Sequence, residues 1–227
     1  MAIRELRSGV SGFRIFLACL ILGVGTISAI GTVKSGIEIA ISEKGSELLG
    51  GNAEAEFTYR LANTEELKWL ETISQNISRI IEFRSMAKFV EEGTNERALT
   101  QVKAVDNEYP LIGNVQLVSG KSFKDVFRQP KSAVMESDLA SRLGIDIGET
   151  FSLGLTKFVL RDIIQSSPDD AGTNFGFGPR TIIKSDDLLD SGLSAPGTLF
   201  TAKYRLLIDP FENLDELRTL AKIKFEN

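Results

Sequence analysis

The residues best suited to contact a ligand or a partner lie between Gln165 and Arg180, where the sequence shows no hydrophobic periodicity. Phe175 and Phe177 alternate with glycines in this stretch, and Arg180 follows them. Two exposed aromatic rings beside a cation could insert into a partner or contact an apolar ligand. The same rings could instead fold back onto the core. We expect a long loop over residues 165–180, with Phe175, Phe177 and Arg180 as candidate contact residues.

The residue types argue against enzymatic chemistry. The chain has no histidine, which excludes Ser-His-Asp and Cys-His catalysis and removes the commonest zinc ligand. The one cysteine, Cys19, lies in an apolar run, so no disulfide can form within the chain and no reactive thiolate is expected. The neighbouring Asp169 and Asp170 do not match a calcium-binding loop, and no P-loop is present. We expect no catalytic residue, metal site or cofactor.

The longest apolar segment is residues 15–33, which contains nineteen residues without a charge. As a helix it would be ~28 Å long, close to the ~30 Å hydrocarbon thickness of a bilayer. A buried core helix would show a polar stripe, and none is visible. A cleaved secretion signal is the other alternative, since arginines precede the run and Ile27-Ser28-Ala29 resembles a poor cleavage site. Signal cores are usually shorter, so we predict a transmembrane helix.

The charges are unevenly distributed along the chain. The net charge is −5, but the first 33 residues carry Arg4, Arg7 and Arg14 against Glu5, which leaves −7 for the rest. An acidic outer part argues against a nucleic-acid partner. Basic residues flanking a span remain in the cytoplasm, and only Lys34 follows the run closely. We therefore expect a cytoplasmic N-terminus (residues 1–14), insertion in the bacterial inner membrane and a periplasmic main domain.

Two features of the predicted membrane segment concern packing and stiffness. Gly25 and Ala29 are four residues apart, the spacing that lets membrane helices approach closely, although small residues are also common in such helices. Over residues 34–50, apolar and charged residues alternate until Gly50-Gly51. We expect this segment to extend the helix outward as a stalk.

Residues 51–227 are expected to form a mixed domain of the α+β class, with a small β-rich subdomain around residues 132–184. Asn63 and Glu66 form a capping-box pattern that predicts a helix with an apolar face reaching Ile80. Asn213 and Glu216 repeat this pattern before the last helix. A short helix is expected, capped by Ser137 and ended by Gly144. Alternating patterns predict strands over 53–61, 81–90, 97–105, 151–153, 157–164, 181–184 and 199–209.

The passage SAVMESDLASRLGIDIGETFSLGLTKFVLRDII (132–164) resembles the extracytoplasmic domain of FtsX-like and MacB-like ABC transporter permeases. The start, RELRSGVSGFRIFLACLILGVGTISAIGTV, with LLGGNAEAEF and FGFGPRTIIKSDDLLDSG, is most similar to the YbbP-like permeases of that group. The resemblance implies one membrane helix extended into a stalk and followed by a domain of the MacB-like periplasmic core type. The order of these parts along the chain is more specific than any one of them.

The resemblance also implies a function. In such systems a separate cytoplasmic ABC ATPase drives the permease, which carries the motion to its outer domain or exports a substrate, and the implied partners are that ATPase, membrane lipid and a hydrophobic or lipid-like substrate. The alternatives are a singly anchored periplasmic binding or scaffold protein and, with less support, a membrane-bound hydrolase. The apolar stripe of the last helix continues to the end of the sequence, so we expect a fragment of a longer permease.

Overall fold

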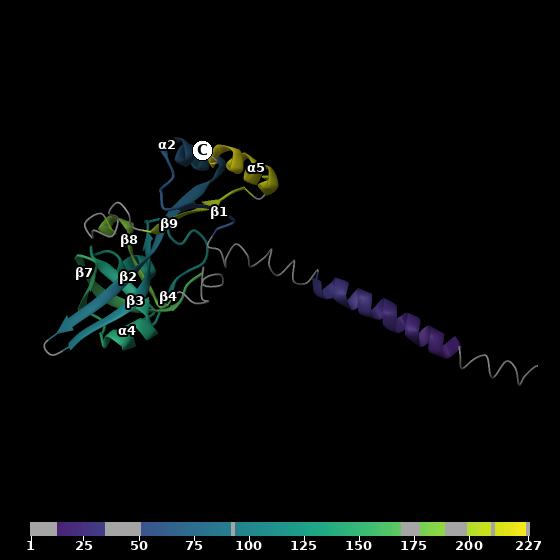
Figure 1. The fold of residues 1–227 in the computed structure, drawn as a ribbon, viewed down its shortest axis with the longest axis horizontal. Coiled ribbons are helices and arrows are strands. Elements are labelled where there is room, and N and C mark those ends of the chain that lie inside the picture. The colour runs from purple at the N-terminus through teal and green to yellow at the C-terminus, as the bar shows by residue number, and fades with distance from the viewer. Residues whose placement is uncertain are drawn as a thin grey trace, which may run out of the picture. The chain divides into compact units, whose positions relative to one another are not determined.

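The computed structural model describes residues 13–34, 51–91, 94–168, 178–188, 199–209 and 212–225. The chain divides into two compact units, Met1–Gly45 and Ser46–Asn227. The first unit contains the helix Phe13–Lys34, and the second contains the remaining helices and the strands (Figure 1). The elements of the second unit are β1 (Ala53–Thr58), α2 (Thr64–Ile73), β2 (Asn76–Glu91), β3 (Thr94–Val105), β4 (Gln116–Leu117), α3 (Phe123–Val126), β5 (Ser132–Glu136), α4 (Ser137–Leu143), β6 (Thr150–Leu153), β7 (Thr156–Ser166), β8 (Arg180–Lys184), the 3₁₀ helix η2 (Ser185–Leu188), β9 (Phe200–Leu207) and α5 (Leu214–Phe225).

The described strands form one sheet in the order β1-β9-β2-β3-β8-β5-β7-β4, and β6 pairs with both β2 and β7. The pairings β2-β3-β8-β5-β7-β6-β2 therefore close into a ring. The ring includes β2 and β3, which lie outside the residues 132–184 expected as a β-rich subdomain, together with β5 to β8. A closed ring removes exposed sheet edges, and its interior is filled by the largest hydrophobic cluster, which includes Phe83, Phe151, Phe158, Met135 and the buried face of α4.

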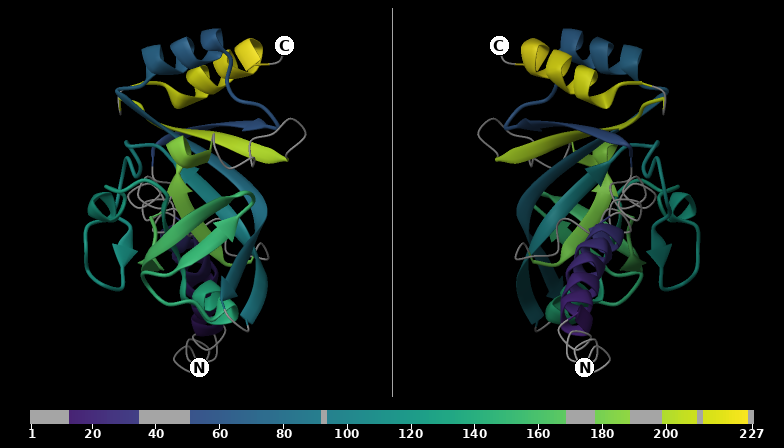
Figure 2. Two further views of the ribbon diagram at one scale, coloured as in Figure 1. Left: turned by 90° about the vertical axis from the view of Figure 1, so that its left-hand side faces the viewer. Right: turned by 90° about the vertical axis from the view of Figure 1, so that its right-hand side faces the viewer.

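A second layer lies at one end of the ring. Strands β1 and β9 extend the sheet beyond β2, and helices α2 and α5 lie side by side over them (Figure 2). Phe57 of β1 packs in this layer against Tyr204 of β9 and Phe225 of α5, with ring centroids 5.6 and 5.1 Å apart. Because β2 belongs to both the ring and this layer, the two hydrophobic cores share one strand.

The capping signals predicted the starts of α2 and α5 and the C-terminal end of α4, whereas Ser137 is the first residue of α4 and Glu136 holds its N-cap position without a side-chain capping bond. Asn63 and Glu66 form a complete capping box at the start of α2. Gly144 ends α4 with φ +65°, a left-handed conformation that favours glycine. The Asn213 side chain accepts hydrogen bonds from the backbone of Asp215 and Glu216 at the start of α5.

Most predicted strand boundaries shift by a few residues, and two predicted segments differ further from the structure. Helix α2 ends at Ile73, and Ile77 and Ile80 belong to β2. The chain leaves the helix there because the Gln75 N–H donates to the Leu207 carbonyl (2.7 Å), which starts the pairing of β2 with β9. The expected loop 165–180 is shorter, because Arg180 is the first residue of β8. The expected stalk lies outside the described residues.

Candidate functional site

The helix Phe13–Lys34 has the length and composition to cross a bilayer. It has 22 residues and a mean hydropathy of 2.2 over its most apolar window. Its two threonines are satisfied within the helix: the Thr26 hydroxyl donates to the Leu22 carbonyl (2.7 Å), and the Thr32 hydroxyl donates to the Ser28 carbonyl (2.9 Å). Such bonds let threonine lie in hydrocarbon without an unpaired donor.

The predicted packing pair remains a prediction. At Gly25, no heavy atom of the described residues would lie within 4 Å of an added Cβ, so that surface is open. Ala29 lies one turn further along the same helix face and is also exposed. An open face of small residues on an apolar helix is compatible with a second membrane helix and with lipid.

The second candidate is an apolar groove in the outer unit, between α2, α5 and β1. Its volume is about 550 Å³, within the range of small-molecule sites. Ala53 and Ala55 of β1 form its floor, and their small side chains leave space beneath α5. The walls are apolar residues of α2, α5 and the end of β9, namely Trp69, Leu70, Ile73, Leu206, Ile208, Leu214, Leu217, Ala221 and Phe225.

Cations flank the groove. Arg218 and Lys222 of α5 line it and are one helical turn apart. Glu54 and Glu56 of β1 also lie along it, but strand alternation turns their side chains to the opposite face from Ala53 and Ala55. On that opposite face, Glu54 is paired with Arg205 at 2.5 Å. The groove thus joins an apolar interior to a positively charged side.

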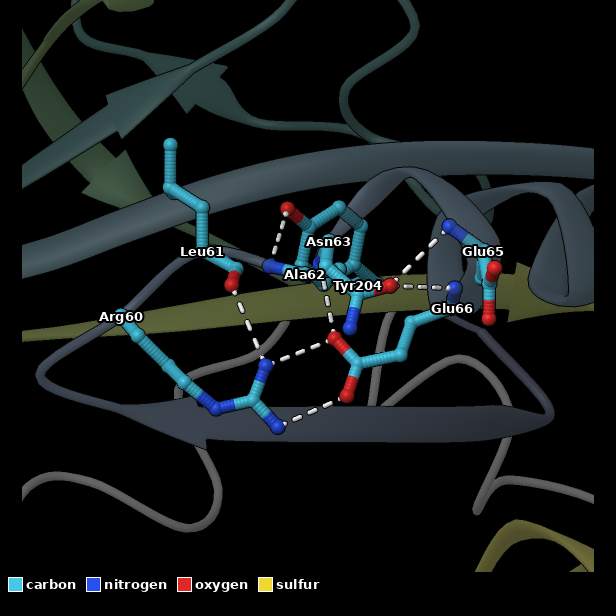
Figure 3. A network of polar contacts seen from close by, with 7 residues as sticks. All are labelled: Arg60, Leu61, Ala62, Asn63, Glu65, Glu66 and Tyr204. Carbon is cyan, nitrogen blue, oxygen red and sulfur yellow. Dashed lines mark hydrogen bonds and ion pairs between the residues drawn. The ribbon is translucent and has the colours of Figure 1, made fainter. Parts of the chain in front are cut away.

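A polar network fixes the start of α2, which forms one wall of the groove (Figure 3). Two guanidinium nitrogens of Arg60 donate to the two carboxylate oxygens of Glu66, at 2.6 and 2.8 Å. The Asn63 N–H donates to the same carboxylate (2.7 Å), and the Asn63 side chain accepts from the backbone of Glu65 and Glu66. The hydrogen bonds from Arg60 lower the pKa of the Glu66 carboxyl below its ordinary value, against the opposing effect of burial.

A further ion pair lies on the sheet face opposite the helices. Lys203 of β9 is 3.0 Å from Glu82 of β2, and both side chains are largely buried. Burial lowers the pKa of the Lys203 ammonium, but the carboxylates of Glu82 and Glu54 together outweigh it and the pKa is raised. Lys203 therefore stays charged and helps to join β9 to β2.

The structure places Arg180 differently from the expected exposed loop position. Its side chain is 9% exposed, and its guanidinium lies 2.6 Å from the Glu136 carboxylate at the end of β5. Arg180 thus joins β8 to β5. Phe175 and Phe177, like Asp169 and Asp170, lie outside the described residues.

Within the described ranges, no group of three or more His, Cys, Asp or Glu side chains could hold a metal ion. The apolar faces of the two helices that line the groove were expected from the sequence, but the groove was not, because the small side chains of Ala53 and Ala55 leave space only once α5 lies over them. Trp69, the only tryptophan in the chain, was the one available signal.

Comparison with known proteins identifies the fold and the relatives. The family model described as the MacB-like periplasmic core domain matches residues 15–210. The chain is 26% identical over 187 residues to the uncharacterized ABC transporter permease YbbP of Escherichia coli K12, covering 82% of this chain and 22% of that protein. The chain therefore spans about a fifth of the length of this curated relative.

Two solved structures are similar to this chain. The periplasmic region of MacB from Actinobacillus actinomycetemcomitans aligns with a TM-score of 0.50 and 10% identity, covering 80% of this chain and 86% of that one. The extracellular domain of the noncanonic ABC-type transporter YknZ from Gram-positive bacteria aligns with a TM-score of 0.46 and 10% identity, covering 76% of this chain and 86% of that one. The family match includes both the apolar helix and the mixed α/β unit, and the chain belongs to the MacB-like periplasmic core domain family.

Proposed function

We propose that this chain is the N-terminal part of an ABC transporter permease subunit, in which one membrane helix connects a cytoplasmic ATPase to an outer domain. The observation that supports this most is the extent of the family match, which runs over residues 15–210 and so includes both the apolar helix and the strands up to β9. The permease relative is much longer than the chain. Transport or force transmission would therefore be properties of a complete protein.

The proposed orientation places the N-terminus in the cytoplasm and the outer unit in the periplasm, with Phe13–Lys34 crossing the inner membrane. Arg4, Arg7 and Arg14 precede the apolar run, and positively charged flanks favour the cytoplasmic side. A helix that continues from the bilayer toward the domain could transmit a displacement as a rigid body. Two glycines inserted between Lys34 and Gly45 of the complete protein would uncouple the outer domain from ATP turnover, and unchanged activity would count against this mechanism.

The proposed substrate class is hydrophobic or lipid-like. The groove between α2, α5 and β1 supports it, because an apolar interior flanked by Arg218 and Lys222 suits an acyl chain with an anionic head group. Trp69 lines the groove and is the only tryptophan, so its fluorescence reports occupancy. A brominated fatty acid should quench Trp69 in a saturable way, and quenching that rises linearly without saturation would contradict a defined site.

The second candidate is a singly anchored periplasmic binding or scaffold protein, which needs only the membrane helix and the groove. The two functions are separated by purification of the complete protein. Co-purification of a cytoplasmic ATPase whose turnover changes with the permease supports the first. A complete protein that binds fatty acid but associates with no ATPase supports the second.

A further inference from the structure

One outer face of the sheet ring is positively charged in an otherwise acidic chain. Residues directly opposite one another in antiparallel strands share a face of the sheet. The register pairs Arg97 of β3 with Lys88 of β2, Lys88 with Ser152 of β6, and Ser152 with Lys157 of β7. Three cations and a serine therefore form one row across four strands, with Arg84 of β2 further along the same face.

This row carries an electrostatic cost. Lys88 and Arg97 are directly opposite each other, and like charges in that position destabilise a sheet. In the part of the chain that the structure describes, no ion pair involves Lys88, Arg97 or Lys157. A like-charge pair without a counter-ion costs folding free energy, and a binding role outside the domain would compensate for that cost.

Apolar side chains are exposed between these cations. Met86 and Leu99 are opposite each other on β2 and β3, one step along from the Lys88–Arg97 pair, and Val90 lies on the same face. Val90 is 69% exposed, and Leu155 at the turn between β6 and β7 is 88% exposed. We call the set Arg84, Met86, Lys88, Val90, Arg97, Leu99 and Lys157 the basic hairpin face.

The basic hairpin face continues into a depression at the edge of β3. The depression has a volume of about 580 Å³ and is lined by Arg84, Arg97, Leu99 and Pro179, with Arg142 contributed by α4. Three arginines from three separate elements thus border one hollow. Figure 1 shows β2 and β3 as a long paired ribbon that extends to one end of the outer unit.

We propose that the basic hairpin face binds an acidic, amphipathic segment of another protein. The positive charge of the face requires a negatively charged partner. The exposed Met86, Val90 and Leu99 would contact apolar side chains that lie between the carboxylates of that partner. Arginine and methionine are enriched at protein interfaces, and arginine is frequent among their hot spots. Apolar side chains and cations alternate along β2 and β3, which matches a protein segment whose apolar and acidic residues also alternate. Anionic lipid also binds surfaces that combine cations with apolar side chains, and the test below separates it from a protein partner.

The test uses the full chain in zwitterionic nanodiscs. The probe is a fluorescent peptide of repeated Glu-Leu-Glu-Glu-Phe, compared with the same peptide carrying Gln in place of each Glu. We expect the acidic peptide to bind in a salt-dependent way and the Gln peptide to bind much more weakly. The double variant Lys88→Gln/Arg97→Gln should weaken binding of the acidic peptide by about tenfold, because two of its cations are removed.

The matched control is Lys121→Gln/Lys124→Gln, which removes two exposed cations elsewhere on the domain and should change binding by less than about twofold. Equal weakening by both double variants would overturn the proposal, because it would show a general charge effect. A loss of binding to phosphatidylglycerol vesicles that exceeds the loss for the peptide would also overturn it, in favour of a membrane surface.

Stability measurements separate a binding role from a structural one. Replacing one member of a like-charge pair should leave the unfolding midpoint unchanged or raise it. Lys88→Arg, which keeps the charge, should retain peptide binding. A lowered unfolding midpoint in Lys88→Gln/Arg97→Gln would contradict the proposed like-charge cost. In that case Lys157→Gln, at the end of the same row, tests peptide binding without disturbing the Lys88–Arg97 pair.

Discussion

The carboxylate of Glu66 should be the main electrostatic contribution to the position of α2. The substitution Glu66→Gln keeps the size and shape of the side chain and removes its charge. Arg60 then loses both of its charge-assisted bonds to this side chain, and the Asn63 N–H is left with a neutral acceptor. Since α2 forms a wall of the groove, the substitution tests the fold and the candidate site together.

The expected magnitude follows from exposure. The Glu66 side chain is 5% exposed, but Arg60 is 41% exposed, so solvent screens their ion pair. Exposed pairs contribute ~1 kcal/mol or less, whereas a capping hydrogen bond contributes ~1 kcal/mol. We expect Glu66→Gln to lower the free energy of unfolding by about 2 kcal/mol at neutral pH, because the loss of charge weakens both interactions.

The effect should depend on pH with a defined sign. Arg60 lowers the pKa of Glu66 in the folded protein below its ordinary value of 4.5. The folded state therefore binds this proton less readily than the unfolded state, and the stabilisation is complete above the unfolded pKa. It should be lost progressively as the pH falls below 4.5 toward the folded pKa. The difference in the free energy of unfolding between the wild type and Glu66→Gln should therefore become smaller in that pH range.

The assay is urea unfolding followed by Trp69 fluorescence, at neutral pH and at several values below 4.5. Trp69 reports directly on α2 because it lies on that helix and contacts Phe225 of α5, at 5.4 Å between ring centroids. The matched control is Glu65→Gln, which removes one charge from the same helical turn without breaking an ion pair. Equal destabilisation by the two substitutions, or a difference that does not change with pH, would refute the reasoning.

Three further outcomes are expected. Phe151 is 1% exposed in the ring core, so Phe151→Ala should lower the free energy of unfolding by ~3–5 kcal/mol in the same urea assay. Ala55→Phe should fill the groove floor and abolish saturable quenching of Trp69 by brominated fatty acid, while a normal far-ultraviolet dichroism spectrum would show that the fold is retained. Gly25→Ile should reduce assembly of the complete permease in cross-linking experiments if Gly25 packs against another helix, and unchanged assembly would mean that this face contacts lipid.

Local signals predicted much of the fold. Capping patterns located the starts of α2 and α5 and the glycine end of α4, since they depend on residues a few positions apart. The end of α2 was misplaced because Ile73, Ile77 and Ile80 fit a helical period. Residues from Asn76 onward instead form a strand because they pair with β9, more than a hundred residues later in the chain. Ring closure through β6 could not be predicted, because it depends on pairing between distant strands.

The site was harder to predict than the fold. Arg180 was expected in a loop because glycines and a proline precede it, but its partner Glu136 lies 44 positions earlier. The groove exists because α5 crosses above two alanines of β1, and the basic hairpin face exists because the register aligns Lys88 with Arg97. Both the groove and the basic hairpin face depend on how the fold places their residues, and no local sequence pattern marks them.

The central claim is that Phe13–Lys34 remains in the membrane and holds the outer unit on the far side. The most direct test replaces the only cysteine by Cys19→Ser and introduces either Ser8→Cys before the helix or Lys121→Cys in the outer unit. A membrane-impermeant maleimide is then added to intact spheroplasts. We predict that Lys121→Cys is labelled at once and that Ser8→Cys is labelled only after lysis. Protection of Lys121→Cys in intact spheroplasts, or loss of the segment containing Ser8 from the mature protein, would contradict the claim.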